Sequence, residues 1–183
     1  MAVPPDFVAG QVLTAAQMNK IGMWLVKTQT IGTAVSSVTV TGAFSADYDN
    51  YRIILTGGVA STSTYMALTL GSTATGYYYG VWGNRYDTGG TTQAQAQNAA
   101  SWPNAFYGNS DSQFGSVDVF NPFNTKQTGY TQQLAINATT TVGVLTGGGY
   151  LANTTSYTAF TLTTVTGGAT LTGGTIRVYG YRN

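Results

Sequence analysis

Six aspartates are the only carboxylate side chains of this chain. They are Asp6, Asp47, Asp49, Asp87, Asp111 and Asp118, and the sequence contains no histidine, no cysteine and no glutamate. Zinc, copper and iron sites are built from histidine or cysteine, and a serine or threonine nucleophile needs a neighbouring base. The composition therefore predicts a protein that is not an enzyme, with no catalytic residue, no metal site and no cofactor.

Two groups of acidic residues match a known chemistry in part. Asp111 and Asp118 could act as the two carboxylates of a glycosidase, although their spacing corresponds to no motif. Asp47, Asp49 and Asn50 have the spacing of the first ligands of a calcium loop, but the glycine and the closing glutamate of such a loop are missing. Surface or turn positions are the favoured interpretation of both groups.

Aromatic residues lie on both sides of a polar segment in the middle of the chain. The candidate ligand-binding residues there are Tyr79, Trp82, Asn84, Arg85, Asp87, Trp102 and Tyr107. Aromatic faces beside amide, carboxylate and guanidinium groups suit a sugar ring, and the same residue types anchor protein interfaces. The alternative is that these rings fill the core of the domain or a seam between subunits.

Alternating apolar and polar residues predict that the chain after Lys27 is β-structure. The alternating runs include Val38–Val40, Ile53–Leu55, Met66–Leu70, Val117–Val119, Leu134–Ile136, Val142–Val144, Phe160–Leu162 and Ile176–Val178. Glycine-rich turns separate them, and no helical pattern intervenes. This organisation predicts an all-β, antiparallel β-sandwich of the jelly-roll type over residues 28–183. The stretch from Tyr86 to Asp111 interrupts the alternation, and we expect it to be a long functional loop.

Residues 1–27 are predicted to form a separate attachment arm. Pro4 and Pro5 favour an extended start. Thr14 and Gln17 can form a capping box, which predicts one short helix from about Ala15 to Val26. Such a helix is marginal alone in water, so it should pack either on the β-domain or on copies of itself. The apolar residues expected to make these contacts are Phe7, Val12, Leu13, Met18, Ile21 and Leu25.

The low charge of the chain limits its partners. Only 7% of its residues are charged, the net charge is +1, and no cluster of Lys and Arg occurs. We therefore expect no binding to nucleic acid. No apolar run has the length of a membrane span and the first residues lack the pattern of a signal peptide, so we expect no membrane insertion and assembly in a cytoplasm. A neutral surface with 32 threonines also suits burial in an assembly.

Both ends of the chain resemble structural proteins of tailed bacteriophages. The segment Phe7–Asn19, FVAGQVLTAAQMN, is similar to the N-terminal segment of tail fibre and minor tail proteins. The segment Thr172–Tyr181, TGGTIRVYGY, resembles their closing strand, and the stretches around Val38–Val40 and Tyr48–Ile53 are similar too. The region from about Tyr77 to Ser112 matches no family pattern.

The resemblance implies a virion protein that is fixed to the particle through its N-terminus. It also implies a homo-oligomer, commonly a trimer, whose distal loops bind a glycan or protein of the host surface. No catalytic residue is implied. The sequence leaves a head fibre or decoration protein of the capsid open as an alternative, and a glycan depolymerase as a less favoured one.

Overall fold

The computed structural model describes residues 10, 12, 22–137 and 142–181, and within these ranges the chain is all-β, with no helix. The strands are β1 (Met23–Thr30), β2 (Ser37–Val40), β3 (Asn50–Thr56), β4 (Val59–Ala60), β5 (Thr64–Leu70), β6 (Tyr77–Arg85), β7 (Thr91–Ala99), β8 (Trp102–Gly108), β9 (Gln113–Phe120), β10 (Thr128–Asn137), β11 (Val142–Leu151), β12 (Phe160–Thr164), β13 (Leu171–Thr172) and β14 (Thr175–Tyr181). Accordingly, no helix in the described ranges could span a membrane.

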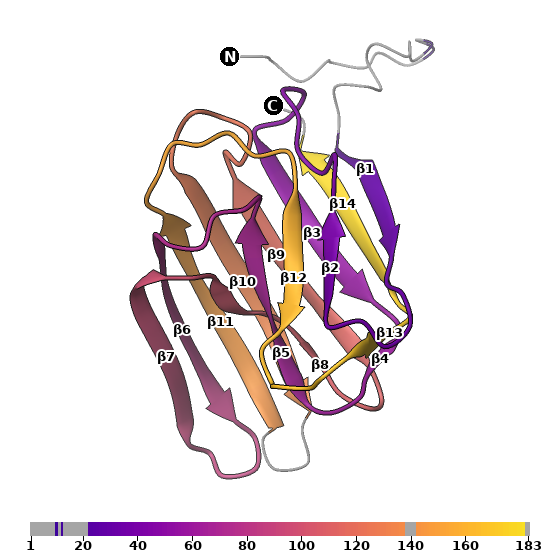
Figure 1. Ribbon diagram of the computed structural model, residues 1–183, viewed down its shortest axis with the longest axis vertical. Helices are drawn as coiled ribbons and strands as arrows, with labels where there is room; N and C mark the ends of the chain where they lie inside the picture. The colour runs from indigo at the N-terminus through magenta and orange to yellow at the C-terminus, as the bar shows by residue number, and fades with distance from the viewer. Residues whose placement is uncertain (1–9, 11, 13–21, 138–141, 182–183) are drawn as a thin grey trace.

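Every strand pairing is antiparallel, and twelve strands belong to one continuous sheet that folds over on itself. We call β1-β14-β3-β9-β10-β11-β6-β7 the large layer and β2-β12-β5-β8 the small layer. The two layers are joined at the β8–β9 hairpin. There β9 pairs with β8 only through Gln113 and Phe114, and from Ser116 onward the same edge of β9 pairs with β10. Figure 1 shows the small layer lying in front of the large one.

The core lies between the two layers and follows from period-two alternation. On β3, for example, Tyr51, Ile53 and Leu55 are buried, whereas the residues between them are half-buried and face away from the small layer. The small layer contributes Leu68, Phe160 and other apolar residues to the same cluster. A strand pattern with one buried and one accessible face is what an antiparallel sheet with a single core requires.

The prediction of a helix up to Val26 is wrong for residues 22–26, the part of it that the structure describes. From Met23 onward the chain forms β1, which pairs with β14 from Met23↔Tyr181 to Thr30↔Thr175. Gly22 precedes it with φ of 93°, a conformation that a helix does not contain. Backbone pairing with β14 outweighs the weak local preference of a short helix. Residues 13–21 lie outside the described ranges, and the predicted domain division at residue 27 stays a prediction.

The expected long loop from Tyr86 to Asp111 is also wrong, because most of it forms β7 and β8. In β7 the glutamines Gln93, Gln95 and Gln97 are exposed, while Ala94 and Ala96 are half-buried. The Gln/Ala repeat is therefore a period-two strand whose apolar residues are too small to give a clear hydrophobic signal. Pairing with β6 stabilises β7 although neither residue type favours strands.

Gln132 is an unfavourable residue in the core. It lies on the inner face of β10, is 2% exposed, and neither atom of its side-chain amide has a hydrogen-bond partner among the described residues. A buried unsatisfied amide costs about 1–3 kcal/mol. We expect Gln132→Met, which keeps the unbranched shape, to raise the free energy of unfolding by about 1–2 kcal/mol in urea denaturation.

The neighbouring Gln133 is a matched control, because it is exposed on the opposite face of the same strand. Gln133→Met should leave the unfolding free energy within about 0.5 kcal/mol of its original value. A loss of stability in Gln132→Met would instead mean that the buried amide makes a bond that favours the fold.

Candidate functional site

One face of the large layer is covered by no other element of the described residues, and we call it the open face. It is the side of β9, β10, β11, β6 and β7 that points away from the small layer, and it carries three of the large exposed apolar side chains, Trp82, Val144 and Tyr150. Trp82 is 53% exposed and Tyr150 is 42% exposed. Exposed aromatic residues that gather on one face typically mark a binding surface.

A row of residues crosses the open face at right angles to the strands. From β7 to β3 its members are Gln95, Gly80, Gly148, Thr131, Asp118 and Arg52. Two adjacent members of this row, Gly80 on β6 and Gly148 on β11, have no side chain. A Cβ placed on Gly80 would meet no atom within 4 Å. The row is therefore the floor of a groove, and no side chain rises from that floor at the two glycines.

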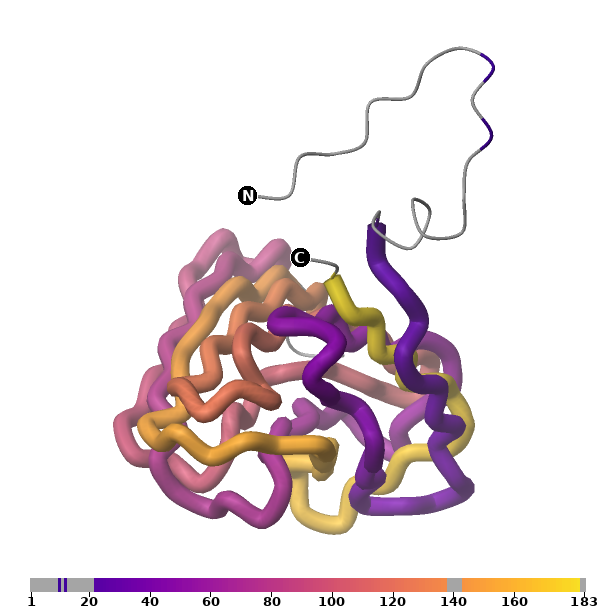
Figure 2. The backbone as a smooth tube through the Cα atoms, turned by 90° about the horizontal axis from the view of Figure 1, so that it is seen from above, coloured from indigo at the N-terminus to yellow at the C-terminus, as the bar shows by residue number. Residues whose placement is uncertain are grey.

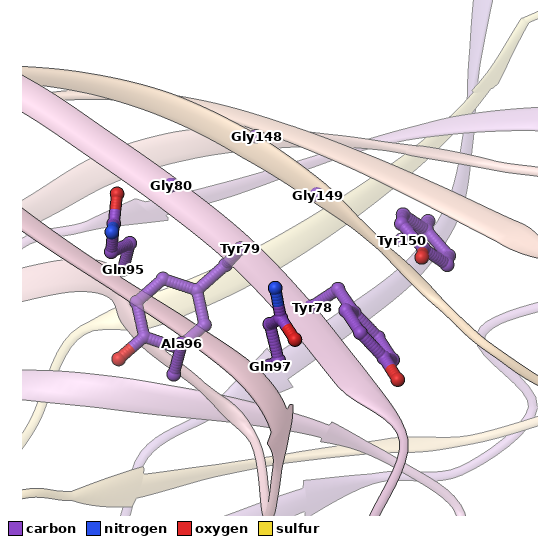
Figure 3. A pocket seen from close by; sticks show the side chains of 9 residues that line it. All are labelled: Tyr78, Tyr79, Gly80, Gln95, Ala96, Gln97, Gly148, Gly149 and Tyr150. Carbon is purple, nitrogen blue, oxygen red and sulfur yellow. The ribbon is translucent and has the colours of Figure 1, made fainter.

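Aromatic rings and polar side chains border this groove on both sides. On one side Tyr78 and Tyr150, which are paired across β6 and β11, stack with ring centroids 4.9 Å apart and planes at 7°. On the other side Trp82 stands opposite Thr146. The hollow beside the tyrosine pair has a volume of about 590 Å³ and reaches Gln95 and Gln97 of β7. Figure 3 shows this hollow with Tyr78, Tyr150 and both glutamines, and with Tyr79, which also lines it.

Two further hollows continue along the open face. One of about 370 Å³ lies between Trp82, Val144 and Gln133, and one of about 330 Å³ lies between Thr131, Gln133 and the Arg52–Asp118 pair. Thr146 and Gln133 line both. The groove is thus bordered by amides, hydroxyls and aromatic rings, with its charged groups at one end.

That charged end is a hydrogen-bonded group in which the charges compensate each other. Arg52 Nε donates to Asp118 Oδ1 at 2.9 Å and Nη2 donates to Oδ2 at 2.7 Å. The hydroxyl of Tyr181 donates to Asp118 Oδ1 at 2.7 Å. Burial by itself would raise the pKa of Asp118, but the bonds from Arg52 and Tyr181 outweigh it and lower that pKa. Burial and the bond to the carboxylate raise the pKa of Tyr181 to about 12.

The lowered pKa of Asp118 makes the stability of the fold depend on pH in the acid range. A carboxyl whose pKa is lower in the folded than in the unfolded chain stabilises the fold above the unfolded value, about 4, and loses this contribution as the pH falls through the folded value. We expect the free energy of unfolding to fall below about pH 4 and to fall less in Asp118→Asn. Between about pH 5 and 8 it should be nearly constant, since the chain has no histidine. Urea denaturation at a series of pH values measures both. Equal acid sensitivity in the variant would contradict this role.

The structure brings only some of the predicted ligand-binding residues to the open face. Trp82 and Asn84 lie there, both exposed on β6. Tyr79 is half-buried: it lines the hollow beside the tyrosine pair and also packs against the core. Arg85 and Asp87 form an ion pair at the end of β6, with Arg85 Nε 3.0 Å from Asp87 Oδ1.

Trp102 and Tyr107 lie in the core. This agrees with the alternative stated from the sequence, in which the aromatic rings fill the interior of the domain. Trp102 is 0% exposed and stacks on Tyr130 with ring centroids 4.5 Å apart. Tyr107 is buried in a smaller cluster with Leu134, Ile136 and Leu145, and its ring meets Tyr65 edge-on. We therefore do not include either ring in the candidate site.

Sequence reasoning missed most of the groove. Tyr78, Tyr150, Gly80 and Gly148 were not among the predicted site residues, and they come together only because β6 and β11 pair in one particular register. The one signal in the sequence was the tyrosine run at Tyr77–Tyr79, where alternation implies that the middle ring faces away from its two neighbours.

The aspartate pairs do not form the sites considered from the sequence. Asp111 lies just before the start of β9, and Asp118 lies near the end of that strand. Because a β-strand rises about 3.3 Å per residue, the two aspartates are roughly 20 Å apart. Glycosidase carboxylates lie about 5–10 Å apart. Asp47 accepts a hydrogen bond from the Ser45 hydroxyl, and Asp49 accepts one from the Asn124 amide. In the described ranges, no group of acidic side chains could hold a metal ion.

The predicted attachment residues fall largely outside the described ranges, which include neither Phe7, Leu13, Met18 nor Ile21. Val12 is exposed, and Leu25 on β1 is 55% exposed beside the exposed Met23 and Trp24. Arg177 on β14 is half-buried and donates to the Thr56 hydroxyl at 3.0 Å.

Comparison with known proteins identifies no relative. No protein-family model matches the chain, no curated protein matches it, and no solved structure matches its fold.

Proposed function

We propose that this protein is a non-catalytic structural component of a tailed-bacteriophage virion, a tail fibre or minor tail protein. Its N-terminal segment anchors it to the particle, and its β-domain binds the host surface. The observation that carries this proposal is the open face, where exposed rings border a groove that no other part of the described chain covers. The resemblance of both chain ends to tail proteins points the same way. The two facing layers support a β-sandwich, and we keep the jelly-roll type as part of the proposal.

The edge of the large layer supports an oligomer, which we take to be a trimer. β1 is an edge strand, because among the described strands it pairs with β14 alone. Its first residues, Met23, Trp24 and Leu25, are large, apolar and exposed. Exposed edge strands associate with other chains unless charges or prolines block them, and the one charged residue of β1, Lys27, follows this apolar segment. Figure 2 shows β1, in indigo, beside β14, in yellow, at one side of the domain.

Light scattering at micromolar concentration tests the assembly. We expect a mass near three times the 19.2 kDa of the chain, and we expect Leu25→Asp to shift it to the monomer. A monomer before any substitution would contradict the oligomer.

A labelled antibody against the protein, applied to virions made from the genome that encodes it, tests its location. Label at the tail supports the proposal. Label on the capsid favours the alternative, a head fibre or decoration protein, and the absence of label from the virion overturns both.

Fluorescently labelled protein, applied to cells of the host of that virion, tests attachment. We expect saturable binding that Trp82→Ala weakens and Tyr86→Ala leaves unchanged, because Tyr86 is exposed but does not line the groove. The glycan depolymerase alternative predicts release of reducing sugar from these cells, which should not occur because the separated aspartates Asp111 and Asp118 cannot act on one bond.

A further inference from the structure

We infer that the groove across the open face binds an uncharged, linear oligosaccharide, laid across the strands over Gly80 and Gly148. This inference rests on the proposed attachment function and names the class of ligand for it. Its first support is the shape of the groove. Tyr78 and Trp82 lie four residues apart on β6, on either side of Gly80, so their backbones are about 13 Å apart. Once the side chains are in place, that gap fits a single narrow chain rather than a folded protein surface.

The length of the groove favours a ligand of several sugar units. The row from Gln95 to Asp118 crosses β7, β6, β11, β10 and β9. With neighbouring strands about 4.8 Å apart, this row is about 19 Å long. An extended ligand can therefore contact the aromatic rings, the glycine floor and Thr131 at the same time.

The chemistry of the lining favours a sugar. Pyranose rings have apolar faces made of C–H groups, and hydroxyls around their edges. The stacked pair of Tyr78 and Tyr150 and the exposed ring of Trp82 offer apolar surfaces with polar tips. The amides of Gln95, Gln97 and Gln133 and the hydroxyls of Thr131 and Thr146 can both donate to and accept from sugar hydroxyls.

The charges of the groove favour a neutral sugar over an acidic one. Arg52 is the one cation that lines the hollows described here, and it makes two hydrogen bonds to Asp118. An acidic sugar placed beside this pair would have to compete with a carboxylate that Arg52 already binds in a fork. The pair instead closes one end of the groove with polar atoms and no net charge.

Gly80 makes a sharp test possible. The space above it is empty, and its backbone is compatible with any side chain, because its φ is not in the left-handed region. Gly80→Val should place a branched side chain on the floor of the groove without a clash and with a residue type that favours strands. If urea denaturation shows that this variant is as stable as the original protein, loss of binding is attributable to the filled groove.

The experiment begins with an array of immobilised oligosaccharides, neutral and acidic, that is probed with the labelled oligomer. The strongest neutral binder is then titrated calorimetrically. We expect neutral sugars to bind, and the affinity to fall about tenfold or more in Trp82→Ala and in Tyr150→Ala, as for an anchoring aromatic residue. Gly80→Val should abolish binding. Tyr86→Ala, the exposed ring outside the groove, should bind as the original protein does.

Several outcomes would overturn the inference. These are binding to acidic sugars alone, unchanged affinity in Gly80→Val, or no sugar binding on the array. Periodate oxidation of host cells separates this failure from failure of the proposed function, because it destroys sugar diols and leaves most proteins in place. If cell binding survives periodate and is lost on protease treatment, the receptor is a protein. The proposed attachment function would then hold, and the oligosaccharide inference would be wrong. Absence of cell binding would overturn attachment itself.

Discussion

Trp102→Ala is expected to lower the free energy of unfolding by about 3–5 kcal/mol, the usual cost of emptying a buried site of this size. Trp102 begins β8 of the small layer, at the end of the strand away from the β8–β9 hairpin, and its ring is completely buried. It stacks on Tyr130 of the large layer and meets Tyr77 edge-on at 5.0 Å. Its indole N–H also donates to the carbonyl oxygen of Tyr78 at 3.3 Å. The ring thus connects the small layer to β6 and β10.

Urea denaturation at fixed protein concentration measures this loss, which corresponds to a fall in melting temperature of about 6–20 °C for a chain of this size. Trp82→Ala is the matched control, because it removes the same ring from an exposed position on the open face. It should change the unfolding free energy by no more than about 0.5 kcal/mol. Equal effects of the two substitutions would contradict the assignment of Trp102 to the core and Trp82 to the surface.

Gly83→Ala is expected to destabilise the fold by about 1–3 kcal/mol or more, because the added methyl group has no room. Gly83 lies on the buried face of β6, opposite Leu145 of β11. A Cβ there would overlap the carbonyl oxygen of Val144 and lie 2.8 Å from Leu145 Cδ2. The nearest obstacle is backbone, which moves only if β6 and β11 separate. Loss of this pairing would also release β7, which pairs with β6 at the edge of the large layer.

Gly80→Ala is the control for this prediction, because it makes the same change on the same strand at a site with no atom within 4 Å. It should be neutral or should stabilise the fold by up to about 1 kcal/mol, through a smaller entropy of the unfolded chain. Denaturation curves of the two variants give the comparison directly. If Gly83→Ala were as stable as Gly80→Ala, the close approach of β6 and β11 would be wrong.

Much of the fold could be predicted from the sequence, because alternation is a local property. Runs such as Ile53–Leu55 and Ile176–Val178 became strands with the expected buried faces. The errors arose where local signals were weak or absent. The Gln/Ala stretch of β7 has no large apolar residue, and Met23–Val26 has a pattern that suits a helix as well as a strand. In both places pairing with a distant strand decided the outcome.

The candidate site was much less predictable than the fold. The sequence indicated aromatic residues near Trp82, but it did not distinguish rings of the surface from rings of the core. Trp82 and Trp102 each stand two residues before an asparagine in the sequence, yet one is exposed and the other is fully buried. Their difference depends on which layer each strand joins and on which face of that layer each ring lies.

By itself, then, the sequence determined an all-β chain with little charge and, in the absence of histidine, cysteine and glutamate, few groups for catalysis. These properties depend on residue type and on period-two order, which can be read along the chain. Only the tertiary structure decided that Gly80 lies beside Gly148 and Tyr78 beside Tyr150, and that Arg52 neutralises Asp118 at the end of the same row. The physical reason is strand register: residues far apart in sequence become neighbours only when backbone hydrogen bonds align their strands, and a shift of one residue would turn every ring to the other face.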